Sequence, residues 1–264
     1  MAFPTEPEVV AAFLAAQADA GVKVATIRRR AAAIHFRHAS AQVESPTRSM
    51  LVAAALKGIR RELGVAPARK APATALRLVE MVRLCPATLQ GVRDRALLLL
   101  GFAGAFRRSE LVALNVEDLE VLPQGLKVTI RRSKTDQEGA GQVIAIARGE
   151  VHCPVAAVQY WLQVAAITMR PALCRVRKSG RVGHEALSDR AVADIVNGYA
   201  KRAGFKAEDF SGHSLRAGFL TSAAEAGAGV LKLVEVSRHR SLDTVRSYVR
   251  SAELFKDHAG AGLL

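Results

Sequence analysis

The sequence predicts a mainly α-helical protein with one small antiparallel β-sheet, an α+β fold divided into two domains. Most of the chain repeats apolar residues at helical spacing, and one segment alternates apolar and polar residues as a hairpin does. Between residues 65 and 72, two prolines, small residues and two cations interrupt the helical pattern, which is typical of a linker. We therefore expect an N-terminal helical domain at residues 1–66, a linker at 67–72 and a second domain at 73–264.

The N-terminal domain is predicted to be a small bundle of helices. Thr5 and Glu8 have the spacing of a capping box, so we expect Thr5 to cap a helix that runs from 9 to 20 and ends at Gly21. Thr26 is expected to open the second helix. The apolar spacing predicts the remaining helices at residues 27–40, 46–55 and 56–63, the last stopping at Gly64.

Five cations of this region are candidates for contact with a polyanion. Arg28, Arg29 and Arg30 lie in the first turns of the second predicted helix, where part of the cluster faces either solvent or phosphate. Arg69 and Lys70 lie in the linker, and a basic linker between two basic domains can follow a DNA backbone.

The second domain is predicted to begin with helices and to change period in its middle. We expect helices at 74–84 and 91–106, and a short helix opened by Ser109. Residues 126–132 alternate and are rich in β-branched side chains, and 142–147 form the return strand. Lys134 therefore lies at the tip of a hairpin.

The remainder of the second domain is predicted to be helical again. A helix is expected at 155–166, followed by a loop that carries Arg175, Arg177, Lys178 and Arg181. Ser188 is expected to cap a helix that ends near residue 203.

Composition bounds the class of protein. The 264 residues are 50% hydrophobic, so the chain can bury a core, and a net charge of +14 indicates a polyanionic partner. Cys85, Cys153 and Cys174 are an odd number and widely spaced, which favours a reducing compartment over a disulfide framework. The N-terminus lacks a signal peptide pattern, and the longest apolar run, 96–105, is too short for a membrane span. We expect a cytoplasmic protein without a membrane partner.

A stretch near the C-terminal end carries the strongest chemical signal. His213 and Arg216 are three residues apart, which brings them to one face of a helix, and Tyr248 follows His239 by nine residues. A tyrosine hydroxyl has a pKa of about 10 and is a poor nucleophile at neutral pH, but fixed cations around it make it usable against a phosphate. Taken alone, Tyr248 fits a half-buried core residue better than a nucleophile, because Val245 and Val249 flank it at helical spacing.

These residues resemble a known family when they are taken together. The segment Ala103–Leu111, the Ser-Lys-Thr hairpin around Lys134, the His213–Arg216 motif, His239 and Tyr248 follow the order and spacing of the tyrosine recombinases, the phage integrase family. The resemblance implies that the second domain has the family's catalytic fold. The N-terminal bundle resembles the core-binding domain that precedes it in that family.

The resemblance implies a role for each matched residue. Arg107 and Arg216 would clamp the scissile phosphate, and His239 would bond one of its non-bridging oxygens. Tyr248 would be the nucleophile, and Glu110 would orient the arginine and histidine groups.

Two further residues are implied to move protons. His213 would accept the proton of the tyrosine, and Lys134 would protonate the departing 5′ oxygen. Because a phosphotyrosine stores the broken bond, rejoining would need neither ATP nor metal, and no cofactor is expected. Arg108 is the alternative to Arg107 as a phosphate clamp, and the alternatives to Lys134 as the proton donor are Lys127 and Arg132.

The sequence departs from the family pattern before the second histidine. The family has Leu-Gly-His, whereas this chain has Val236-Ser-Arg-His239. Arg238 would add charge, and Ser237 lacks the freedom of glycine at positive φ, so the turn is either built differently or the site is weakened. The 16 residues after Tyr248 can dock on a neighbouring protomer or fold back on their own domain.

The function implied by the resemblance is a site-specific recombinase or integrase that cuts and rejoins double-stranded DNA through a 3′-phosphotyrosine. It would act as a homotetramer on paired sites, be a monomer or dimer when free, and accept help from accessory DNA-bending proteins. One alternative is a DNA-binding protein of the same fold that has lost catalysis. Another is a strand-relaxing enzyme like the type IB topoisomerases. The neighbouring Tyr160 and Trp161 are expected in the core rather than as a base-stacking platform.

Overall fold

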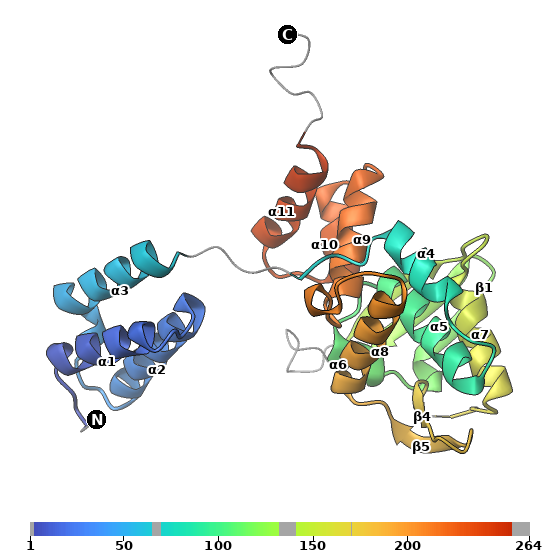
Figure 1. The fold of residues 1–264 in the computed structure, drawn as a ribbon, viewed down its shortest axis with the longest axis horizontal. Helices are drawn as coiled ribbons and strands as arrows, with labels where there is room; N and C mark the ends of the chain where they lie inside the picture. The colour runs from blue at the N-terminus through green and yellow to red at the C-terminus, as the bar shows by residue number, and fades with distance from the viewer. Residues whose placement is uncertain (1–2, 65–69, 132–140, 170, 255–264) are drawn as a thin grey trace, which may run out of the picture. The chain divides into compact units, whose positions relative to one another are not determined.

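The computed structural model describes residues 3–64, 70–131, 141–169 and 171–254 (Figure 1). The chain divides into two compact units, residues 1–69 and 70–264. Helices dominate, together with a three-stranded and a two-stranded antiparallel sheet, which confirms the predicted α+β class. Within the described ranges, no helix has the length and apolar character needed to cross a membrane.

Over residues 3–64, the first unit is a bundle of three α-helices and one 3₁₀ turn. Its elements are α1 (Pro7–Asp19), α2 (Val24–Ser40), η1 (Pro46–Arg48) and α3 (Met50–Leu63). Apolar residues at helical spacing form one small core, made by Val10, Leu14, Val24, Ile27, Ala31, Val52 and Ile59. Gly21 and Gly64 both adopt positive φ just after a helix, as predicted from their role as helix terminators.

Three predictions for this unit were wrong in detail. The N-cap position of α1 is Glu6 and not Thr5, and it makes no side-chain capping bond; the Thr5 amide instead donates to the ring of His38. Helix α2 begins at Val24, so Thr26 lies inside it, because tertiary burial of Val24 and Ile27 extends the helix beyond its polar signal. The segment predicted as two helices at 46–55 and 56–63 is instead the 3₁₀ turn η1 followed by the single helix α3. Helix α3 begins after Ser49, whose Oγ accepts from Val52 N, and no glycine or proline interrupts it after Ala55 until Gly58, which the helix accommodates.

The second unit contains helices α4 to α11 and both sheets. Its helices are α4 (Ala75–Arg83), α5 (Leu89–Ala103), α6 (Arg108–Val112), α7 (Pro154–Val164), α8 (Asp189–Arg202), α9 (Ser214–Glu225), α10 (Val230–Ser237) and α11 (Leu242–Ala252). The 3₁₀ turns are η2 (Val116–Asp118) and η3 (Ala207–Asp209). The strands are β1 (Leu119–Leu122), β2 (Gly125–Ile130), β3 (Gln142–Ala147), β4 (Cys174–Val176) and β5 (Val182–Ala186).

The three-stranded sheet has the order β1-β2-β3, and Val128 pairs with Leu119 on one side and Ile144 on the other. The strand predicted at 142–147 is confirmed, and the one predicted at 126–132 is confirmed as far as Ile130, while residue 132 lies outside the described residues. Strand β1 was not predicted. The segment from 175 to 181, predicted as a loop, is instead the hairpin of β4 and β5. Helix α5 starts two residues before Gly91, because Thr88 accepts a hydrogen bond from Gly91 N and caps it.

Helix α5 is the centre of the main core. Four successive leucines, 97 to 100, are all buried, so the helix is covered on every side. It packs on α7, whose fully buried Trp161 donates from Nε1 to Ala172 O at 2.8 Å. Tyr160, expected in the core with Trp161, is instead 55% exposed on the outer face of α7. The end of α5 leads directly into the segment that carries Arg107.

A second, smaller cluster joins the last three helices. Helix α11 packs on α9 and α10, which lie side by side in Figure 1. Leu220, Leu233 and Val245 are buried between them, and Tyr248 packs against this cluster. The apolar face of α11 therefore fixes where its tyrosine lies.

A strap formed by residues 71–75 crosses α9 at a glycine. Ala73 N donates to Ser214 O at 2.9 Å, and Ala75 N donates to Ser222 Oγ at 2.9 Å. Between these bonds, a Cβ on Gly218 would lie 1.9 Å from Ala73 O. The strap can lie this close to the helix that carries Arg216 only because position 218 has no side chain.

Gly218→Ala is expected to lower the free energy of unfolding by about 1–3 kcal/mol, because its methyl group pushes the strap off α9. Urea denaturation measures this change. The matched control is Gly198→Ala in α8, where a Cβ meets nothing within 4 Å, and it should raise stability by up to about 1 kcal/mol. Equal effects of both changes would show that the close approach has no importance.

Candidate active site

The site begins at the short helix α6, where Glu110 binds the residue that precedes the helix. Glu110 is 2% exposed, and its Oε2 accepts from Arg107 N at 3.0 Å while its Oε1 accepts from Arg107 Nη1. Burial alone would raise the pKa of Glu110, but the charges of Arg238 and Arg107 and the bonds from Arg107 bring it below its ordinary value. An ionised carboxylate thus holds Arg107 in place.

Arg216 lies on the first turn of α9 and is 4% exposed. Its Nη1 donates to Ala105 O at 2.7 Å, and its Nη2 lies 3.2 Å from His239 Nδ1. Burial, followed by the charges of Arg107 and Arg238, lowers the pKa of Arg216 to about 9, so the guanidinium still carries its charge at neutral pH. Two cations, Arg107 and Arg216, therefore reach the same site from different helices.

His239 is neutral and its tautomer follows from its neighbours. A guanidinium can only donate, so Nδ1 must accept from Arg216, and the ring proton lies on Nε2. Ser237 Oγ lies 2.8 Å from the same Nδ1. Burial, together with the charges of Arg216, Arg107 and Arg238, lowers the pKa of His239 to about 4 against the opposing effect of Glu110. The ring can donate from Nε2 without carrying a charge.

This arrangement predicts that His239 stays neutral down to about pH 5. The pKa of His239 is about 4 in the folded chain and near 6.5 in the unfolded chain. Between these two values the unfolded chain binds the proton more strongly, so the free energy of unfolding falls as the pH drops from 6.5 toward 4. NMR titration of the ring protons, assigned with a His239→Gln variant, measures it directly. Titration of His239 near pH 6.5 would contradict the burial and the cationic surroundings described here.

The turn between α10 and His239 is formed by a residue that the sequence did not single out for this purpose. Arg238 has φ 58° and ψ 39°, the left-handed conformation, and Ser237 is the last residue of α10. Of the two possibilities left open by the sequence, the structure has a turn built differently, with the positive φ at Arg238 and not at Ser237. The signal was present in the sequence, because Arg238 stands immediately before the histidine, where the family pattern has glycine.

Tyr248 lies in the middle of α11 and is partly buried. Its phenol is close enough to Arg216 to affect the pKa of that guanidinium. Helix α11 packs on α9, the helix that carries Arg216. The fold therefore brings the tyrosine to the cationic cluster from a third helix.

The structure distinguishes Arg107 from its neighbour. Arg107 points into the cluster around Glu110, and its Nη2 donates to Arg238 O at 3.1 Å. Arg108 instead lies over Gly212, and its Nη2 is 3.9 Å from a carboxylate oxygen of Asp189. Only Arg107 of this pair takes part in the cluster.

Of the two residues expected to move protons, only His213 lies within the described residues. His213 precedes the first turn of α9 and is exposed, with its amide donating to Ser211 Oγ at 3.2 Å. Lys134 and its rival Arg132 lie outside the described residues. The other rival, Lys127, lies on β2 and binds Glu120 at 2.7 Å.

The cations expected to contact DNA lie on the surface where they are described. Arg28 and Arg29 are exposed on α2, and Arg30 is half-buried. Lys70 is exposed, and its Nζ donates to Glu208 O. Arg69 lies outside the described residues.

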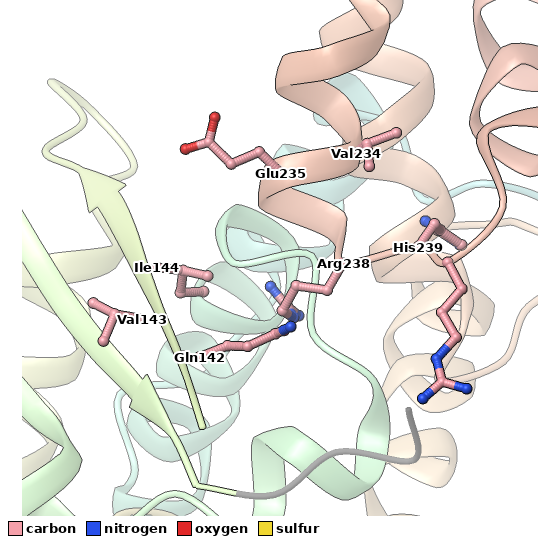
Figure 2. Close-up of a pocket in the computed structure, with 8 residues that line it drawn as sticks. Gln142, Val143, Ile144, Val234, Glu235, Arg238 and His239 are labelled. Atoms are coloured by element: carbon pink, nitrogen blue, oxygen red, sulfur yellow. The ribbon is translucent and has the colours of Figure 1, made fainter. Parts of the chain in front are cut away.

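A cavity of about 370 Å³ opens beside the cluster (Figure 2). It is lined by the first residues of β3, Gln142, Val143 and Ile144, and by the C-terminal part of α10 with the turn that follows: Val234, Glu235, Arg238, His239 and Arg240. In Figure 2 the Arg238 side chain extends from the end of α10 toward Gln142. The cavity gives the cluster an open side.

Comparison with known proteins gives a consistent result. The model of the phage integrase family matches residues 73–254. An integrase/recombinase xerD homolog of Selenomonas ruminantium is 38% identical over 263 residues, which cover 97% of this chain and 76% of the relative. The recombinase cre of Escherichia phage P1 is 26% identical, over 95% of this chain and 78% of its own.

A solved structure resembles the fold over nearly the whole chain. It is the XerH site-specific recombinase bound to a palindromic difH substrate in a post-cleavage complex, with a TM-score of 0.73 at 18% identity. The match covers 99% of this chain and 73% of the XerH chain. At this identity the likeness concerns the fold.

Proposed function

The chain belongs to the phage integrase family, the site-specific tyrosine recombinases, and on this premise we propose which of its residues cut and rejoin DNA. The observation that carries the proposal is the convergence of two guanidinium groups, Arg107 and Arg216, and a neutral His239 beside the helix of Tyr248. This is the set of groups that phosphoryl transfer to a phenol requires.

Arg107 and Arg216 bind the non-bridging oxygens of the scissile phosphate. Attack on a phosphodiester builds negative charge on these oxygens, and planar guanidinium groups match that charge in pairs of bonds better than an ammonium does. His239 donates from Nε2 to one of them. Because the pKa of His239 is about 4, the ring keeps the same neutral form around pH 7, with its proton on Nε2, and can donate in this way.

Tyr248 is the nucleophile. Its Oη forms a bond to phosphorus while the bond from phosphorus to the 5′ oxygen breaks, which leaves a 3′-phosphotyrosyl link and a free 5′ hydroxyl. A 5′ hydroxyl from another strand then attacks the phosphotyrosine and restores the phenol. Since one phosphoester replaces another at each step, rejoining needs no energy source.

Two proton transfers complete the reaction. His213 accepts the phenolic proton, and Lys134 gives a proton to the departing 5′ oxygen, which is otherwise a strong base. The position of the two strand ends supports the second assignment, because β2 ends at Ile130 and β3 begins at Gln142, which lines the cavity beside His239.

The partner is double-stranded DNA. The net charge of +14 supports this, as does the XerH relative in structure, which is bound to its difH substrate. We assign residues 1–66 as the core-binding domain, 67–72 as the linker and 73–264 as the catalytic domain. Strand exchange between two duplexes needs four cuts, one for each strand, which supports a tetramer on paired sites. A DNA substrate supports a cytoplasmic location.

The alternative of a DNA-binding protein without catalysis rested on the missing glycine before His239. That argument loses its basis, because Arg238 adopts the backbone conformation that glycine would supply. A strand-relaxing activity remains a variant of the same chemistry, and it is distinguished by acting without sequence preference.

The test is to trap the covalent intermediate. DNA sites that the full chain binds are selected from a random duplex library, and the selected duplex is then nicked beside the cut site so that the released piece is lost. A denaturation-resistant adduct should form, and mass spectrometry of its digest should place the nucleotide on the peptide that contains Tyr248. Absence of an adduct on every selected site, or an adduct at another residue, would overturn the assignment.

A further inference from the structure

Arg238 occupies a backbone conformation that disfavours it. Its φ of 58° lies in the left-handed region, where a Cβ crowds the following carbonyl and where glycine is the usual residue. A long charged side chain in this position is retained only if its contacts offset the strain. Those contacts are therefore the place to look for its role.

The side chain of Arg238 is buried and reaches three separate segments. Only 7% of the residue is exposed, and its guanidinium lies 5.3 Å from the centre of the Phe106 ring. It donates to Glu110 Oε2 on α6 at 2.9 Å, to Val236 O on its own helix, and to the segment after α5. In that segment the acceptors are Gly104 O and Ala105 O, each at 3.1 Å.

The acceptors of Arg238 are shared with the two arginines proposed to bind the phosphate. Glu110 Oε2 accepts from both Arg238 Nη2 and Arg107 N, and Ala105 O accepts from both Arg238 Nη2 and Arg216 Nη1. Arg107 Nη2 in turn donates to the main-chain oxygen of Arg238. One buried guanidinium thus connects the anchors of both phosphate-binding groups with the turn that leads to His239.

We propose that Arg238 is a positioning residue of the strand-cutting reaction, which holds Arg107, Arg216 and His239 in one arrangement through Glu110 and Ala105. It takes the place of the turn glycine and adds a second function to that position. The inference rests on the proposed active site, because it concerns the groups that contact the phosphate and assigns no contact with DNA to Arg238 itself.

Arg238 also determines which oxygen of Glu110 binds the Arg107 side chain. Glu110 is a buried acid that faces Arg107 and Arg238 together. With Arg238 present, one carboxylate oxygen is occupied by each side chain. Without it, both oxygens are left to Arg107, which is drawn toward Glu110 and away from the open side of the site.

Arg238→Gly is the decisive variant, because glycine keeps the left-handed turn and removes only the side chain. The experiment follows a single round of adduct formation on a nicked duplex with the full chain in excess. We expect the cleavage rate constant to fall at least about 30-fold, while the Kd for DNA changes less than about 2-fold. Incomplete folding would lower the amplitude of the reaction, whereas misplaced groups lower its rate constant, so the two causes are separated.

Three further variants sharpen the test. Arg238→Lys keeps the charge but has one donor centre, so it should recover only part of the rate. In a Glu110→Gln background, Arg238→Gly should have a smaller effect than in the wild type, because the two residues act together. The control Arg190→Ala removes one exposed cation from α8 and should leave the rate constant unchanged.

The possible outcomes separate this inference from the proposed function. If the wild type forms no adduct, both fall together. If the wild type forms the adduct and Arg238→Gly cuts at the same rate constant, only the role of Arg238 is overturned. If Arg238→Gly loses its cooperative melting transition, the test passes to Arg238→Lys. A wild-type cleavage rate constant in Arg238→Lys would show that no bridging guanidinium is needed and would overturn the inference.

Discussion

Tyr248→Phe is expected to abolish the covalent adduct with DNA while leaving DNA affinity unchanged. The ring packs against the cluster of Leu220, Leu233 and Val245, and phenylalanine retains that packing, so α11 stays in place. What is lost is the oxygen that forms the bond to phosphorus, and no other group can replace it. We expect the rate of adduct formation to fall roughly 10⁴-fold or more, below detection on a denaturing gel.

The other two tyrosines of the chain make this prediction sharp. Tyr199 is buried and donates to Asp94 Oδ2 at 3.1 Å, and burial followed by the Asp94 charge raises its pKa above the ordinary value. Tyr160 is exposed on α7. Tyr160→Phe is therefore the matched control and should form adduct at the wild-type rate, and an adduct that survives Tyr248→Phe would contradict the proposed chemistry.

The fold was predictable from sequence where local pattern and tertiary packing agree. The alternation of β2 and β3 matches their paired register, and Ser188 caps α8 by accepting from Ala191 N as predicted. The hairpin of β4 and β5 was missed, because its strands have only three and five residues and their register shifts between Cys174 and Val176. Such short, irregular strands show no sustained alternation of apolar and polar residues in the sequence.

The site was predictable as a set of residues and not as a geometry. The motifs place Arg107, Arg216, His239 and Tyr248 in order along the chain, but nothing in that order specifies that Arg216 bonds His239 Nδ1 and fixes its tautomer. Arg238 was seen only as added charge. Its function depends on four acceptors from three segments, and one of them, Glu110, is separated from it by 128 residues.

Glu110→Ala is expected to be the most destabilising change in the site. The carboxylate is 2% exposed and accepts from Arg107 N, Arg107 Nη1 and Arg238 Nη2. Its removal leaves two guanidinium groups buried close together without their counterion, beside a third at Arg216. Breaking a buried ion pair by removing one partner costs about 3–5 kcal/mol, and we expect a loss of this size in the free energy of unfolding.

The activity of the Glu110 variants should fall for a related reason. Without the carboxylate, Arg107 loses the bond that orients its guanidinium, and repulsion from the nearby Arg238 displaces Arg107 from the phosphate site. Glu110→Gln keeps the shape and one acceptor oxygen, so it should fold better than Glu110→Ala but still cut DNA at least about 10-fold more slowly than the wild type, an effect of about 1.4 kcal/mol on the barrier.

The control for these two variants is Glu235→Gln on α10. Glu235 lines the cavity beside the cluster, but it is exposed, and among the contacts described for it the carboxylate is bound only to Lys232, at 2.9 Å. An exposed ion pair contributes about 0–1 kcal/mol, so this variant should remain close to the wild type in urea denaturation. If Glu110→Ala were as mild as Glu235→Gln, the buried carboxylate would not be the counterion of Arg107 and Arg238. The cluster would then be held by its carbonyl acceptors alone, at Gly104, Ala105 and Val236.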